Sequence, residues 1–150
     1  MRGRAIAFVC LLAGVTSCKP ANVTEAEAKG NVAWLDQQST PDAVAALGRL
    51  ADTDEKALDA LKTRASYDVN AYIAAWNATK RNKPWGAQMI RAGLTDPTRA
   101  EVAATGLPRN DPGVAQFVPE LEQAVSRLAA GSRGTTIAAI LASLGKPALQ

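Results

Sequence analysis

Residues 41–52 read PDAVAALGRLAD and contain the pattern that decides the fold of this chain. Pro41 and Asp42 are typical of a first helical turn, because proline fits the first helical position and an acidic group there favours the helix dipole. Alanine and large aliphatic residues then follow at helical spacing, without the alternation of β-branched and aromatic residues that marks a strand. The stretch therefore predicts an alanine-rich amphipathic helix.

Related segments occur four times along the chain. Each holds two small residues, one further residue and a glycine or asparagine, at 45–48, 74–77, 103–106 and 142–145. Their last residues are separated by 29, 29 and 39 positions. Small residues allow close helix packing, and glycine or asparagine can adopt the left-handed conformation that ends a helix. Because another amphipathic segment precedes these stretches, the sequence predicts repeated helix pairs.

Turn signals divide the chain into eight expected helices and no strands. The clearest of these signals are Ser39-Thr40 ahead of Pro41 and the proline-rich cluster at 108–113. Pro119 falls inside the seventh helix, where it either kinks the helix or marks its true start. The sequence thus predicts an all-α protein with helices near 31–38, 42–50, 55–65, 68–80, 85–94, 98–106, 113–130 and 133–144.

This arrangement resembles short HEAT repeats, of the variety also found in phycobilisome lyases. Residues 43–52 and 136–147 carry the resemblance most clearly, and it covers about residues 31–147. It implies antiparallel helix pairs stacked as a short solenoid, in which the second helices line the concave face. Asp96-Pro97 supplies the acidic turn of such repeats, but the other units lack a clear Asp/Arg ladder. An irregular helical bundle is the alternative.

The N-terminus has the layout of a secretory signal. Arg2 and Arg4 precede an apolar run over residues 5–15, and Val-Thr-Ser-Cys follows at 15–18. With a cysteine after the small residues, the segment resembles a bacterial lipoprotein signal cleaved between Ser17 and Cys18. The resemblance implies a diacylglycerol on the Cys18 sulfur and an acyl chain on its amine. A soluble secretory signal or an uncleaved anchor are the alternatives.

Three segments follow from this interpretation: a signal peptide at 1–17, a lipidated tether at 18–30 and a HEAT-like domain at 31–150. The resemblance implies a lipid-anchored protein of the bacterial cell envelope. Lys19, which follows the cysteine, is not acidic. In bacteria that read this position for sorting, that favours the periplasmic side of the outer membrane.

Composition excludes several classes of function. The 150 residues include no histidine, which excludes Ser-His-Asp and Cys-His sites and the ordinary zinc sites. Cys10 would leave with the signal and Cys18 would carry lipid, so no thiol remains for a disulfide. Loss of Arg2 and Arg4 lowers the formal net charge from +3 to about +1, which gives no case for nucleic-acid binding. We therefore expect no catalytic residue, metal, cofactor or enzymatic activity.

The charged clusters are interpreted mainly as helix caps and solvated faces. The carboxylates occur at Glu25 and Glu27, at Asp52, Asp54 and Glu55, and at Glu120 and Glu122. Residues 80–85, KRNKPW, form the one concentrated basic patch. It is typical of a helix C-terminus leading into a loop, and contact with anionic headgroups or an acidic partner is the alternative.

The candidate partner surface consists of Trp85, Ile137 and Ile140. Trp76 occupies the core position of its repeat and is expected to be buried, whereas Trp85 follows a proline and is the better exposed anchor. The last expected helix carries apolar residues on more than one face, which predicts an uncovered edge and self-association through that helix.

These observations together predict a membrane-anchored adaptor or assembly factor that binds another protein through a helical-repeat surface. A small apolar-ligand binder, or an accessory subunit of an envelope enzyme, is the alternative. A purely structural envelope protein is a third possibility.

Overall fold

The computed structural model describes residues 19–128 and 135–145, and every regular element in these ranges is helical. This confirms the predicted all-α class. The expected helices are found with ends displaced by a few residues, and one additional helix precedes them. In chain order the elements are α1 (Val23–Ala28), α2 (Val32–Asp36), α3 (Pro41–Leu50), α4 (Glu55–Arg64), α5 (Val69–Lys80), α6 (Pro84–Thr95), α7 (Ala100–Thr105), the 3-10 helix η1 (Pro112–Phe117), α8 (Val118–Leu128) and α9 (Thr135–Ser143).

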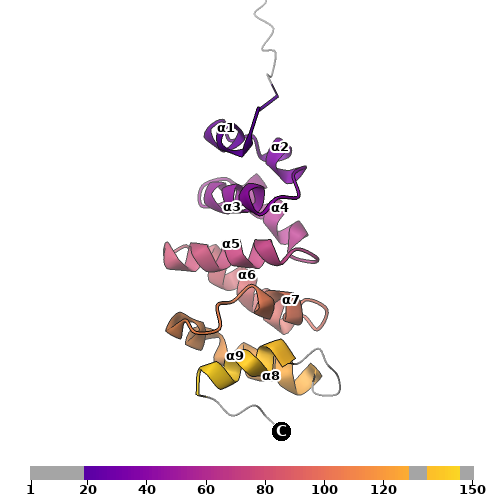
Figure 1. Cartoon of the computed structure of the whole chain (residues 1–150), viewed down its shortest axis with the longest axis vertical. Helices are drawn as coiled ribbons and strands as arrows, with labels where there is room; N and C mark the ends of the chain where they lie inside the picture. Colours follow the sequence, from indigo (N-terminus) through magenta and orange to yellow (C-terminus); the bar gives the residue numbers. More distant parts are fainter. Residues whose placement is uncertain (1–18, 129–134, 146–150) are drawn as a thin grey trace, which may run out of the picture.

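The helices lie in two rows and follow one another along the long axis in chain order (Figure 1). In the first row α1, α3, α5, α7 and α9 each contact the next member. In the second row α2 contacts α4, and α6 contacts α8. Most helices adjacent in the sequence also pack on each other, and the contact between α5 and α6 is the most extensive.

Side-chain caps define the beginnings of three central helices. The Thr40 hydroxyl accepts from the amide of Ala43 at 3.3 Å, at the start of α3. The Asp54 and Asp68 carboxylates cap α4 and α5 by accepting from amides two residues ahead, each at 2.9 Å. These groups satisfy amides that have no partner inside the helix, which is why the starts were readable from sequence.

The seventh expected helix begins with a change of helix type. Residues Pro112–Phe117 form a 3-10 helix, and the α-helix begins at Val118. Pro119 therefore lies in the first turn of α8, where a missing amide proton costs no hydrogen bond. The interpretation of Pro119 as the true helix start is confirmed.

The prediction that the repeated Gly/Asn positions end helices in a left-handed conformation holds at Gly145, whose φ is +73°, but is wrong at the other three. Gly48 and Asn77 lie inside α3 and α5, and Gly106 follows α7 with a right-handed φ of −75°. Asn82 instead has the left-handed φ of 56° after α5. The glycines at 48 and 106 serve close packing, which local sequence alone does not reveal.

Helix α5 lies at the centre of this packing. A Cβ on Gly48 of α3 would lie 2.8 Å from the Cβ of Ala74. A Cβ on Gly86 of α6 would lie 2.3 Å from the carbonyl oxygen of Ala75, a distance that real Cβ atoms do not reach. The neighbouring helices therefore approach α5 at points where only glycine fits.

The side chains of α5 also fill the core. Trp76 is only 6% exposed, which confirms its predicted core position. Its ring meets that of Phe117 edge to face, with centroids 6.4 Å apart and planes at 62°. Tyr72 is buried as well: its ring fills the space beside Gly93, and its Cβ lies against Gly106. One helix thus connects α3, α6, α7 and η1 through a continuous apolar cluster.

The structure corrects the expected tether at 18–30. Residues Val23–Ala28 form α1, which packs on α3, and Ala26 is fully buried. Nη2 of Arg49 in α3 also donates to Oε2 of Glu27 at 2.7 Å. The folded domain therefore begins near Pro20, because alanine in this short helix meets an apolar surface on α3. Residues 1–18, with Ser17, Cys18 and the expected signal, lie outside the described residues.

The prediction that Ile137 and Ile140 face outward is wrong. Both side chains are fully buried, as is Leu141, because α9 contacts both α7 and α8. The apolar residues that cover more than one face of this helix therefore have two neighbours to cover them. This removes the reason for expecting self-association through α9. Residues 133–134 and 146–150 lie outside the described residues.

We predict that Gly48→Ala destabilises the protein by about 1–3 kcal/mol, because its Cβ would overlap that of Ala74. Ala74→Gly removes the opposing atom. The double variant should therefore lose less free energy of unfolding than the sum of the losses in the two single variants. Urea unfolding of the four proteins measures this coupling. Gly86→Ala is the matched comparison. Its Cβ would overlap the backbone carbonyl of Ala75, which no side-chain substitution at position 75 removes. Additive effects at positions 48 and 74 would contradict the close approach.

Candidate functional site

The basic stretch at 80–85 is held by carboxylates of the domain itself. Nε of Arg81 donates to Oδ2 of Asp52 at 2.9 Å, and its Nη2 reaches Oδ1 of Asp52 and the carbonyl of Gly48, both at 3.1 Å. Lys80 forms an ion pair with Asp111 and lies over the ring of Trp76. These contacts join successive helix pairs, so most of the patch is not a free surface for anionic headgroups.

Trp85 is not the exposed anchor that the sequence suggested. Its ring is partly buried against the core, and its Nε1 donates to Oδ1 of Asp52 at 3.0 Å. Trp85 lies in the first turn of α6, far along the chain from Ile137 and Ile140 in α9. The three residues of the predicted partner surface therefore do not form one surface. The acidic cluster at 52–55 caps a helix as expected, through Asp54 at the start of α4, and Asp52 pairs with Arg81 and Trp85 instead.

Arginines form a ladder between successive helix pairs. Arg64, Arg81, Arg91 and Arg127 each donate to a group 25 to 33 positions away in the sequence. This spacing is close to the 29-residue separation of the repeated segments. Arg64, Arg81 and Arg91 each donate to a carboxylate and to a backbone carbonyl, whereas Arg127 donates to a carbonyl. Because carbonyl acceptors leave no mark in the sequence, a regular Asp/Arg pattern was absent from it.

Arg64 is the buried member of this ladder, with a side chain only 6% exposed. It donates from Nε to Oδ1 of Asp36 at 2.9 Å and from Nη2 to the carbonyl of Gln38 at 3.0 Å. The carbonyl of Asp36 also accepts from Nη2. Carbonyls at the end of a helix have no partner within it, so Arg64 satisfies the end of α2 and fixes α4 against it.

The exposed large apolar side chains of the described part of the chain are Tyr67 and Ile73. Tyr67 lies in the turn between α4 and α5 and is 68% exposed, and Ile73 lies on α5 and is 42% exposed. An aromatic ring left in water beside a well-packed core is the kind of side chain that carries binding energy in protein interfaces. These two residues are the strongest candidates for a contact surface.

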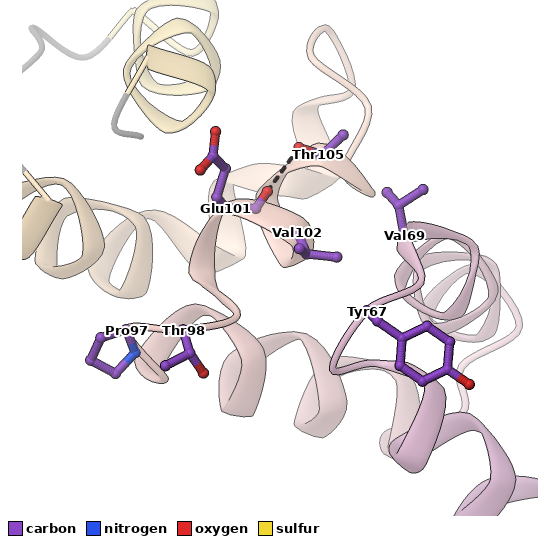
Figure 2. A pocket seen from close by; sticks show the side chains of 7 residues that line it. All are labelled: Tyr67, Val69, Pro97, Thr98, Glu101, Val102 and Thr105. Atoms are coloured by element: carbon purple, nitrogen blue, oxygen red, sulfur yellow. Dashed lines mark hydrogen bonds between the residues drawn. The ribbon is translucent and has the colours of Figure 1, made fainter. Parts of the chain in front are cut away.

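A hollow of about 500 Å³ lies beside Tyr67, between the start of α5 and helix α7. Figure 2 shows Tyr67 and Val69 on one side of it and Val102 on the other, with Pro97 and Thr98 at the turn before α7. Glu101 and Thr105 complete the lining. The hydroxyl of Thr105 is engaged with the carbonyl of Glu101 at 2.8 Å, and that of Thr98 with Oδ1 of Asp96 at 2.7 Å.

The chemistry of this hollow favours binding over catalysis. Its apolar groups are supplied by Tyr67, Val69, Pro97 and Val102, and Glu101 is the one ionisable carboxylate in its lining. No nucleophile is paired with a base there. At the turn Ser66-Tyr67-Asp68 the sequence predicted only the start of the helix near 68–80, so the hollow was not expected. The unusual tyrosine within that turn was the available signal.

Within residues 19–128 and 135–145, no group of three or more Cys, Asp or Glu side chains could hold a metal ion. No helix in the same ranges is both long enough and apolar enough to cross a membrane. Comparison of the chain with models of protein families, with curated proteins and with solved structures gives no match. The functional proposal is therefore based on the sequence and on the geometry of the described residues.

We predict that Asp52 makes stability depend on acidity. Burial by itself raises the pKa of Asp52, but hydrogen bonds from Arg81 and Trp85 and the charges of Arg81 and Lys83 lower it below its ordinary value. The folded protein therefore binds fewer protons at this group than the unfolded chain. Its stabilising contribution is present above the unfolded pKa and is lost as the pH falls through the folded pKa, below about pH 4.

Melting temperatures of the native protein and of Asp52→Asn, measured at pH 7 and pH 3, test this prediction. The variant should melt lower at pH 7, and the difference should shrink at pH 3. Asp59→Asn, at an exposed carboxylate in the middle of α4, is the control and should show a small difference at both values. An Asp52→Asn difference that is equal at both pH values would contradict the assignment.

Proposed function

We propose that this chain is a lipid-anchored protein of the bacterial cell envelope whose HEAT-like helical domain binds another protein as an adaptor or assembly factor. The observation that supports the proposal most directly is the 68% exposure of Tyr67 beside the α5–α7 hollow. Large apolar side chains elsewhere in the described chain are buried or partly buried, Ile73 excepted. Tyr67 and Ile73 are therefore the proposed contact residues.

The position of this surface in the stack supports the proposal. Ile73 and the α7 residues of the hollow belong to the row formed by α1, α3, α5, α7 and α9. In the HEAT-like resemblance these are the second helices of each pair, the row that lines the concave face and presents side chains to a partner. Tyr67 precedes α5 at the edge of that row.

The anchoring part of the proposal rests on Cys18 and on the short distance between it and the fold. Helix α1 begins at Val23, five positions after Cys18. Five extended residues span at most roughly 18 Å. A lipid on Cys18 would therefore hold the domain directly against the bilayer. Lys19 after the cysteine favours the periplasmic face of the outer membrane in bacteria that sort by this position.

Lipidation is tested with Cys18→Ser. The unchanged protein should incorporate a clickable fatty acid in growing bacteria and sediment with the envelope. The variant should lose the label, because serine offers no thiol for the diacylglycerol. Equal labelling of both proteins would contradict lipidation at Cys18, and envelope retention without label would point to an uncleaved anchor.

Partner binding is tested by placing a photocrosslinking amino acid at position 67 in intact cells. We expect a discrete crosslinked band that weakens several-fold when Ile73→Ser is added, because that change removes part of the apolar contact. Position 56, exposed on α4 in the other row, is the matched control. Circular dichroism should show unchanged helicity. Absence of any discrete adduct at 67 relative to 56 would contradict a partner at this surface.

A further inference from the structure

The second row of helices is interrupted between α4 and α6. Helix α2 packs on α4 and α6 packs on α8, but α4 and α6 make no comparable contact. A groove of about 350 Å³ lies between them. Its volume falls at the lower end of the range of small-molecule sites, about 300–1,000 Å³.

The interior of this groove is largely apolar. Leu58 and Ala65 line it from α4, and Trp85, Met89 and Gly93 line it from α6. Tyr72 of α5 contributes to the lining, with its ring against Gly93. A Cβ on Gly93 would lie 2.4 to 2.6 Å from the phenol atoms of Tyr72, so glycine at this position allows the Tyr72 side chain to pack directly on the α6 backbone.

The charged residues that line the groove are both cationic, Lys62 and Arg99. Their carboxylate partners, Asp59 and Asp96, are not part of its lining. The lining therefore contains two cations, the amide of Gln88 and the Tyr72 hydroxyl, but no carboxylate. Both cations are paired with a carboxylate, Lys62 with Asp59 at 3.3 Å and Arg99 with Asp96 at 3.2 Å, so an anionic group in the groove would share them with these residues.

These groups are arranged with an apolar end and a charged end. Trp85, in the first turn of α6, donates a hydrogen bond to Asp52, which lies two residues before the Asp54 cap of α4. This contact places the start of α6 beside the start of α4. Leu58 and Trp85 are thus near the same end. Lys62 and Arg99 come from the last turn of α4 and from the turn after α6. Burial raises the pKa of the Tyr72 phenol, on which the charges of Arg99 and Asp96 act in opposite directions.

We propose that the groove between α4 and α6 binds a single-chain anionic amphiphile, a fatty-acid carboxylate. The acyl chain lies along Leu58, Met89 and Trp85, and the carboxylate lies between Arg99 and Lys62. This site is separate from the Tyr67 surface and does not rest on partner binding there. The apolar floor of the groove fits the acyl chain of such a ligand, and the cationic end fits its carboxylate. A neutral alkane has no charge for the cationic end, and a cationic detergent would be repelled there.

The experiment uses the full chain in phosphatidylcholine nanodiscs and 12-bromododecanoate, whose bromine quenches nearby tryptophan fluorescence. We expect saturable quenching that disappears in Trp85→Phe and persists in Trp34→Phe. Arg99→Gln should weaken the apparent affinity about tenfold, in line with loss of one charge-assisted contact. Arg109→Gln, at an exposed arginine outside the groove, is the matched control and should leave the affinity unchanged.

A second variant blocks the groove without touching its charges. Ala92 is exposed on α6 and lines the groove, so Ala92→Phe should fill it and abolish saturable quenching while the melting temperature stays near that of the native protein. Quenching that never saturates, equal affinity of Arg99→Gln and Arg109→Gln, or equally tight binding of neutral 12-bromododecanol would each overturn the proposal.

Discussion

The close approach of α3 and α6 to the alanine-rich helix α5 is the constraint on which the rest of the structure depends. Gly48 meets Ala74, and Gly86 meets the backbone of Ala75, at distances that leave no room for a Cβ. Close backbone packing allows Trp76 and Tyr72 to reach the neighbouring pairs and become buried. Because the chain has so few aromatic residues, this dense packing of small side chains replaces the large core that bulkier sequences build.

Polar contacts then fix the register between successive helix pairs. Exposed ion pairs such as Lys62 with Asp59 contribute little to stability by themselves, because water screens them. Arg64 differs, since its buried guanidinium satisfies carbonyls at the end of α2 and would leave them unpaired if removed. The ladder of arginines therefore joins helix pairs whose sequences differ.

These contacts within the fold also decide which surfaces remain free to bind other molecules. Most of the basic stretch at 80–85 and the apolar face of α9 are used within the fold. Two features of the described chain are not used in this way: the Tyr67 surface with its hollow, and the groove between α4 and α6. They share no lining residue and differ in chemistry, although the turns at 65–67 and 97–99 contribute residues to both.

Local sequence by itself determined the all-α class, the positions of most helices and the burial of Trp76, because caps, prolines and helical periodicity act within a few residues. Tertiary structure alone decided the packing roles of Gly48 and Gly106, the bond of Trp85 to Asp52 and the burial of Ile137 and Ile140. It also brought residues Val23–Ala28 into the domain. The physical reason is distance along the chain: whether a side chain is buried or paired depends on a neighbour about one repeat away, which periodicity does not identify.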